Sequence, residues 1–405
     1  MPRTRTTSAS RPHRDTERLV QLAQALHAST SRVEDRFWER QIETTLEKLF
    51  KAGQDAPVEG ALDQLLGVEG GAYDVLIEMC ETLSESFVFE KDGQRYEALL
   101  IVAPLAVWTR YQIPANKIRP EALDALRAQL HGHVLAQDAQ LALVPTLLSV
   151  DQMPRTFSAT LQWLQRLTMQ AIGKNTTQKV TIAQDTEIAG MLADSRYLAG
   201  VVVVPEGAPM FRWQEAPDDP QATRLACLTG WTAQAEPTLA SLLPGCGFDI
   251  LLPDAWYVGN READRRVRPL SLRAALGWLE TAAGFQPDGL RAVIAGCGEH
   301  QIDEYRIGFT ARNSNDVIYG CVWPLFGRED AEPELLGEEG APTGALEEIV
   351  GLLKALGMTD IRRLPGILPM EFCEDCGAPL FPDPVGNMEH AELPEDVDTT
   401  PKHFH

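Results

Sequence analysis

Val201-Val202-Val203-Val204-Pro205 is a β-branched run of strand length that ends in proline. A run that is apolar at every position is typical of a strand whose sheet is covered by helices on both faces. Leu99-Leu100-Ile101-Val102-Ala103-Pro104 precedes it by about 100 residues, and Ile318-Tyr319-Gly320-Cys321-Val322-Trp323-Pro324 follows it by roughly the same interval. These runs predict buried strands at the start of three similar units.

Each unit continues in the same order, with a helical pattern and then a second Pro-ended strand. The helices are expected near residues 120–135, 220–242 and 344–356, and the second strands near 141–145, 250–253 and 361–369. Duplication of one strand-helix-strand unit explains this pattern, and chance recurrence of the same punctuation is the alternative. Further strands are expected at 291–295 and 304–310.

The pattern before the first unit is helical. Apolar residues between about Asp15 and Lys91 recur at spacings of three to five, with charged residues on the other faces. Ser31 followed by Glu34 is a capping-box start, and Gly53 is a stop signal. We expect three or four helices here, and then a turn at Asp92-Gly93 that leads into a strand.

The fold class is therefore predicted to be α/β or α+β, with an N-terminal helical segment, about three repeated strand-helix-strand units and a C-terminal metal knuckle. The expected boundaries are a disordered basic arm at 1–18, a helical region at 19–93, α/β units at 94–174, 175–286 and 287–370, and a metal-binding acidic tail at 371–405.

The net charge limits the partners that can be expected. The chain has 36 basic and 58 acidic residues and a formal charge of −22, so its surface repels phosphate backbones and anionic lipid. Only the first 18 residues are basic, with five arginines against two acidic residues. We therefore expect an unidentified protein as the partner, and nucleic acid only through this arginine arm.

The cysteines and the hydropathy indicate a compartment. Seven cysteines, an odd number, are scattered along a chain of 405 residues, which suits reduced thiols better than a disulfide framework. The longest apolar run, Ala98 to Trp108, is shorter than the roughly 20 residues that a membrane helix needs. We therefore expect a cytoplasmic location and no membrane partner.

Phe372-Cys373-Glu374-Asp375-Cys376-Gly377-Ala378-Pro379 holds the one constellation whose residue types and spacing a particular chemistry requires. A redox dithiol needs a low thiol pKa, whereas Glu374 and Asp375 are expected to raise the pKa, and the prolines that follow prevent a helix from starting here. A divalent ion keeps both thiolates ionised, and Gly377 permits a tight turn around it. The sequence therefore predicts one zinc ion, most simply in a structural role.

Two sets of residues could complete the zinc site. In the first set the ligands come from the same tail, namely His390, His403 and His405, of which the last two alternate on an extended segment. In the second set they are Cys297 and His300 of Gly296-Cys297-Gly298-Glu299-His300. We expect the tail to supply them, so that the metal ligands are drawn from Cys373, Cys376, His390, His403 and His405.

Sequence signatures of catalysis are missing. The chain has no Gly-x-Ser-x-Gly elbow, no His-Glu-x-x-His and no phosphate-binding loop. We therefore expect a non-enzymatic, zinc-stabilised binding or regulatory module. The alternative is a metal-assisted hydrolase with its site near the knuckle and Glu374, Asp375 or Glu299 as the base.

The cysteine pair resembles one half of a zinc ribbon, in which Cys-x-x-Cys-Gly precedes a short apolar strand such as Leu380-Phe381. This chain departs from a ribbon because no second Cys-x-x-Cys follows. Taken together, the Pro-ended strands, the knuckle and Glu389-His390-Ala391-Glu392-Leu393-Pro394 resemble a family of betaproteobacterial proteins of unknown function. That resemblance implies a bacterial cytoplasmic protein and transfers no catalytic residues.

Overall fold

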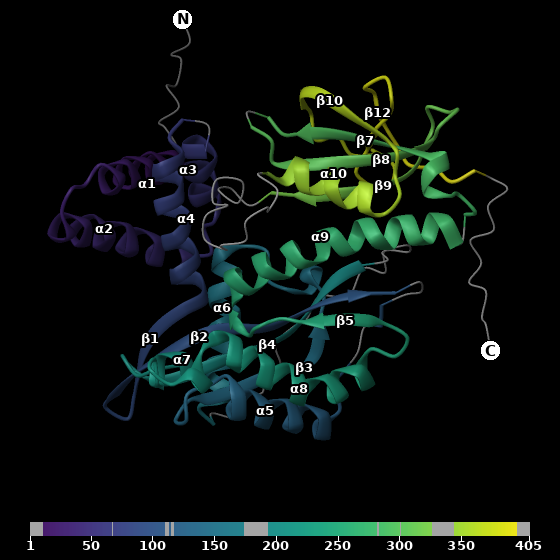
Figure 1. Cartoon of the computed structure of the whole chain (residues 1–405). Helices are drawn as coiled ribbons and strands as arrows, with labels where there is room; N and C mark the ends of the chain where they lie inside the picture. Colours follow the sequence, from purple (N-terminus) through teal and green to yellow (C-terminus); the bar gives the residue numbers. More distant parts are fainter. Residues whose placement is uncertain are drawn as a thin grey trace, which may run out of the picture.

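The computed structural model describes residues 11–66, 68–109, 113–114, 117–173, 193–281, 283–299, 301–325 and 344–394. Its helices and strands form the expected mixed fold, in which N-terminal helices precede two main sheets. Figure 1 shows one sheet in the lower half of the molecule, the other in the upper half, and the long helix α9 (Trp256–Thr281) between them.

Four helices open the described chain, as the apolar spacing predicts. They are α1 (Arg11–His27), α2 (Arg32–Lys51), α3 (Ala56–Leu66) and α4 (Gly70–Glu85). The Ser31 hydroxyl accepts the Glu34 N–H at 3.3 Å and caps α2, and Gly53 follows its end with φ of 65°. Helix α1 already begins within the segment 1–18 that was expected to be an arm.

A tight hairpin joins these helices to the first sheet. Strand β1 (Ser86–Lys91) pairs with β2 (Gln94–Trp108) across Asp92 and Gly93, whose φ values are 53° and 77°. Two successive positive φ values are those of the two-residue turn that matches the twist of a hairpin, and Asp-Gly is a preferred sequence for it.

The first sheet places the two most apolar runs side by side. Strand β4 (Ala193–Pro205) pairs with β2 so that Val202 lies opposite Leu99. The other members are β3 (Gln140–Leu148) beside β4, and β5 (Gly247–Ile250) and β6 (Asp254–Ala255) beside β2. All these pairings are antiparallel, although strands buried on both faces are more typical of parallel sheets.

Helices cover both faces of this sheet, which explains the continuous apolar runs. Helices α5 (Pro120–His133) and α8 (Arg224–Leu242) share a core with one face, and α6 (Phe157–Ala171) and α9 share a core with the other. The second strand of the first unit, β3, pairs with β4, while the second strand of the second unit, β5, pairs with β2. The two units are thus interleaved, and each lends a strand to the other.

The third unit belongs to a separate sheet. Strands β7 (Leu290–Cys297), β8 (Glu304–Ala311) and β9 (Val317–Pro324) form an antiparallel meander, and β10 (Asp360–Leu368) pairs with β7 in parallel. The order strand, helix, strand is retained in β9, α10 (Ala345–Ala355) and β10, but β7 and β8 separate the two strands in the sheet. Helices α9 and α10 cover one face.

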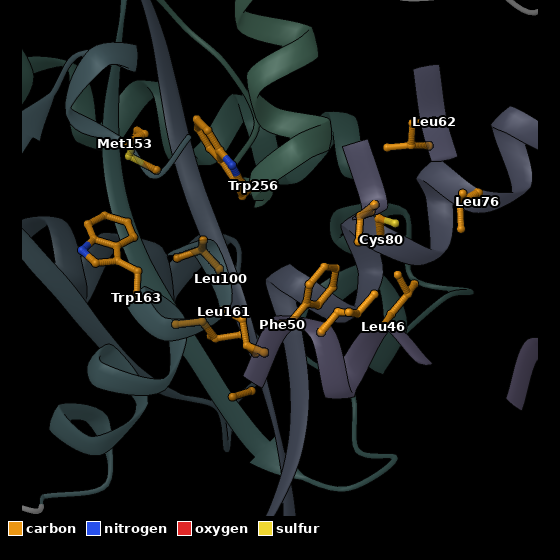
Figure 2. Packing of buried hydrophobic residues seen from close by; sticks show 14 of the residues in the cluster. Leu46, Phe50, Leu62, Leu76, Cys80, Leu100, Met153, Leu161, Trp163 and Trp256 are labelled. Carbon is orange, nitrogen blue, oxygen red and sulfur yellow. The ribbon is translucent and has the colours of Figure 1, made fainter. Parts of the chain in front are cut away.

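The N-terminal helices share a hydrophobic core with the first sheet. Figure 2 shows Leu46, Phe50 and Cys80 from these helices near Leu100 of β2 and Trp256 of α9, and all are buried in one cluster. Burial of this apolar surface holds the helical region against the first sheet. Within the described chain, no helix is both long enough and apolar enough to cross a membrane.

Candidate metal centre

The C-terminal segment crosses the face of the second sheet that α9 and α10 leave open. Its short strand β11 (Phe381–Pro382) lies over β8 and β9, where Gly308 and Gly320 stand opposite each other. A Cβ atom on Gly320 would come within 2.2 Å of the Phe381 ring, and one on Gly308 within 2.3 Å of the Pro382 carbonyl oxygen. The paired glycines therefore provide the space in which the segment packs.

Arg306 of β8 joins this face to the cysteine loop. Its side chain is fully buried, and its guanidinium donates to the carbonyl oxygens of Glu371 and Leu380, which lie on either side of the two cysteines. Its Nε pairs with Glu304 at 2.6 Å, and its Cζ atom is 4.9 Å from the centroid of the Phe372 ring. One arginine thus holds both ends of the loop.

The loop itself is a tight turn that returns the chain upon itself. The Cys373 N–H donates to the Ala378 carbonyl and the Gly377 N–H to the Cys373 carbonyl, both at 2.8 Å. Gly377 has φ of 71°, a left-handed conformation that favours glycine. The turn brings Cys376 back toward Cys373, and the two thiols are free.

Backbone N–H groups point at the first sulfur. Hydrogen bonds from the Cys376 and Asp375 backbone hold the pKa of Cys373 below its ordinary value, and the Asp375 charge raises that pKa only weakly. The Asp375 charge thus acts in the expected direction, but the backbone hydrogen bonds outweigh it, so the net shift of the Cys373 pKa is downward. N–H groups directed at sulfur stabilise a thiolate, which is the form that binds metals.

A second turn delivers the histidine. The buried Asp383 carboxylate accepts the backbone N–H groups of Val385, Gly386 and Asn387, and so folds the chain back between β11 and β12 (Met388–Glu389). His390 follows β12 directly.

The returning strand places His390 beside the loop. Its Nε2 lies 3.3 Å from the Cys376 Sγ, and its Nδ1 lies 3.7 Å from a carboxylate oxygen of Glu392. At 3.7 Å the Glu392 carboxylate is in ion-pair range of His390 and beyond the length of a hydrogen bond.

The three ligand atoms fit one ion. The Sγ atoms of Cys373 and Cys376 and a ring nitrogen of His390 all lie within 4.8 Å of one another. Bonds of about 2.3 Å to sulfur and about 2.0 Å to nitrogen can meet at a centre between atoms at such separations. In the ranges that the structure covers, these residues are the one cluster of three or more such side chains that could hold a metal ion.

The predicted site residues are thus brought together in part. Cys373, Cys376 and His390 converge, whereas His403, His405 and the alternative ligand His300 lie outside the described residues. Cys297 is buried within β7 and is no member of the cluster, and burial raises its thiol pKa to about 11.

Sequence reasoning missed the residues that build the site around these ligands. The alternation along β8 indicates that Arg306 and Gly308 share one face, opposite Tyr305 and Ile307, but nothing local shows that the tail covers this face. Asp383 stands in Pro382-Asp383-Pro384, where the two prolines indicate a turn as well as preventing a helix.

Comparison with known proteins gives a family and no activity. The family model described as a protein of unknown function (DUF2863) matches residues 4–404, so the chain belongs to this family. No curated protein and no solved structure matches the chain.

Proposed function

We propose that this member of the DUF2863 family binds one zinc ion through Cys373, Cys376 and His390, and that the ion locks the C-terminal segment onto the second sheet. In this proposal the metal is structural and the chain acts as a cytoplasmic binding or regulatory module for a protein partner. The observation that carries the proposal is the convergence of the three ligand atoms on a loop whose two ends Arg306 holds.

Zinc suits this donor set better than other common ions. Two thiolates and an imidazole are soft to borderline ligands, and a tetrahedral site of sulfur and nitrogen is typical of zinc. A fourth ligand completes the tetrahedron, and we propose His403 or His405 for this place because both belong to the same tail.

A structural role agrees with the surroundings of the ligands. Apart from β11, the segment Phe372–Glu392 buries little apolar surface, and Phe372, Val385 and Cys376 are exposed. A segment that buries so little apolar surface is stabilised mainly by turns and cross-links. A bound metal ion is one such cross-link. The free state of all seven cysteines supports a reducing compartment.

The test is the metal content of the purified full-length protein and its response to substitution. We expect one zinc ion per chain, lost in Cys373→Ser but retained in Cys246→Ser, which alters a half-buried thiol elsewhere in the chain. Limited proteolysis should then cut between residues 371 and 394 in Cys373→Ser and leave this segment intact in the control.

Two results would contradict the proposal. One is a purified protein without zinc whose Cys373→Ser variant resists proteolysis as well as the wild type. The other is metal-dependent hydrolysis of ester or phosphoester substrates that disappears in a folded Cys373→Ser variant, because this result would favour the metal-assisted hydrolase instead.

A further inference from the structure

A groove of about 700 Å³ lies along the edge of the first sheet, and its residues are well separated in sequence from the cysteine loop. Helix α8 forms one wall, α9 forms the other, and β5 and the residues after it form the floor. Figure 1 shows β5 running between α8 below it and α9 above it.

The walls are regular stripes of the two helices. Residues four apart on α8 line the groove, and so do residues four apart on α9; they are Arg224, Leu228, Thr232 and Glu236 on α8 and Val258, Glu262 and Arg266 on α9. Side chains four apart lie on the same face of a helix, so each helix presents one continuous face to the groove.

The floor is an edge strand. Strand β5 pairs with β2 on one side, and in the described part of the chain no strand pairs with its other side. In an antiparallel pair every second residue points its N–H and C=O away from the partner strand. Such outward groups are a template to which an extended segment can add as a further strand.

The two sides of the groove differ in character. Phe248 and Ile250 of β5 pack toward the α8 core, and Leu228 lies beside them. On the α9 side Asp249 pairs with Arg266 at 2.6 Å, and Val258 is 40% exposed. A strand added to β5 would therefore meet an apolar surface on one face and a charged surface on the other.

The charges favour a basic occupant. Four carboxylates line the groove against two guanidiniums, and both guanidiniums are already paired, Arg224 with Asp254 and Arg266 with Asp249. Glu262 pairs with Arg265, outside the lining. Glu236 is exposed and has no ion pair among the described residues, so it is available to a cation from outside.

We propose that this groove binds an extended segment of a partner protein by adding it as a strand to β5, and that the side chains of the segment that face α8 are apolar and then basic, with small polar side chains on its other face. The apolar side chains pack against Leu228 and Phe248, and the basic side chain, further along the same face of the segment, meets Glu236, which lies on α8 two turns beyond Leu228. This inference rests on the binding part of the proposed function and names the surface and the partner chemistry, but it needs no metal.

The test uses a fluorescein-labelled nine-residue peptide with valine at positions 1, 3 and 5, lysine at positions 7 and 9 and threonine between them, titrated with the full-length protein in fluorescence polarisation. We expect saturable binding that weakens at least tenfold in Glu236→Lys. The matched control is Glu280→Lys, the same charge change at an exposed position of α9 outside the groove, and it should bind as the wild type does.

Two further peptides separate strand addition from charge attraction. The same peptide with glutamate in place of lysine should bind at least tenfold more weakly, and a backbone N-methylated version with unchanged side chains should not bind. The Cys373→Ser protein should bind the first peptide with unchanged affinity, so a failure of the zinc proposal and a failure of this one are distinguishable.

Three results would overturn the inference. They are absence of binding to the lysine peptide, equal affinity for the N-methylated peptide, and a wild-type dimer in solution that dissociates in Glu236→Lys. The last result would assign the groove to a second copy of the chain.

Discussion

At the scale of single residues, Arg306 is the buried side chain that contacts both ends of the cysteine loop. It has no exposed surface, and its Nη2 has no hydrogen-bond partner among the described residues. A buried guanidinium is tolerated only where partners offset its desolvation, and here these partners are Glu304, the Phe372 ring and two carbonyl groups of the loop. The loop and the arginine therefore stabilise each other.

Replacing Arg306 by lysine should loosen the zinc site without removing a ligand. One ammonium group cannot pair with Glu304, lie against Phe372 and donate to both carbonyls at once. We expect zinc to transfer to a chromophoric chelator at least tenfold more readily, and the visible spectrum of the cobalt-substituted protein to change. Arg363→Lys, on the exposed side of β10, is the control; equal zinc retention in both variants would contradict the role of Arg306.

Gly320→Ala should displace the C-terminal segment from the sheet. The added methyl group would lie 2.2 Å from the Phe381 ring, so the ring and β11 must move. We expect a lower free energy of unfolding by about 1–3 kcal/mol and earlier proteolysis of residues 371–394. In Gly351→Ala, where nothing lies within 4 Å of the new methyl group in α10, stability should be unchanged or rise. Equal effects in the two variants would argue against the close contact.

At the scale of elements, the end of α4 meets the start of α9 through a buried carboxyl group. Glu85 accepts the Tyr257 N–H at 2.9 Å, and burial raises its pKa to about 7. Glu81, Asp254 and Arg261 lie close enough to influence it, and Glu81 pairs with Arg261 at 2.7 Å. This junction joins the N-terminal helices to the long helix between the sheets.

The pH dependence of stability should report this junction. Because the folded-state pKa of Glu85 is raised, the folded protein holds the proton more tightly than the unfolded chain, and stability falls as pH rises from about 4.5 to about 7. Glu85→Gln keeps an acceptor for Tyr257 and removes this titration. In urea unfolding, the free energy of unfolding of the variant should therefore rise relative to that of the wild type between pH 5 and pH 8, by a few kcal/mol at most. A constant difference across this range would contradict the raised pKa.

The boundaries of helices and strands could be predicted where nearby residues determine them. The pairing of the strands could not. Ser31, Gly53 and Asp92-Gly93 mark boundaries through their own backbone preferences, so the sequence places them correctly. The run Val201–Val204 predicts a strand that is buried on both faces, but it does not indicate whether the neighbouring strand is parallel or antiparallel. Its pairing with residues 97–100 depends on contacts across about 100 residues of chain, which no local pattern encodes.

For the candidate metal site, the sequence indicated the ligands but not the residues that support them. The spacing of Cys373, Cys376 and Gly377 is typical of a metal-binding turn, and His390 follows at a distance that one short hairpin can bridge. Arg306, Gly308 and Gly320 act on the loop from other strands, so their role appears only when the tail is seen lying across them.

At the scale of the whole molecule, α9 separates two bodies of different construction. The first sheet is covered by helices on both faces, and the N-terminal helices extend its core. The second sheet has helices on one face, and the C-terminal segment is the cover of the other. The candidate metal site therefore lies on the body with helices on one face, and the groove beside β5 belongs to the body with helices on both faces.

Removal of the metal should accordingly loosen one body and spare the other. Hydrogen-deuterium exchange of the chelated protein should rise in β11, in β12 and in the strands β8 and β9 beneath them, because these amides lose their cover. Exchange in β2 and β4 should stay as slow as before. A uniform rise across both sheets would show that the ion supports the whole fold instead.

The most direct measurement is zinc K-edge X-ray absorption on the purified full-length protein, with Cys373→Ser alongside. We predict two sulfur neighbours at about 2.3 Å and one or two imidazole nitrogens at about 2.0 Å, and one sulfur fewer, or no zinc, in the variant. Zinc with only oxygen and nitrogen neighbours, or a protein that binds no zinc at all, would contradict the account.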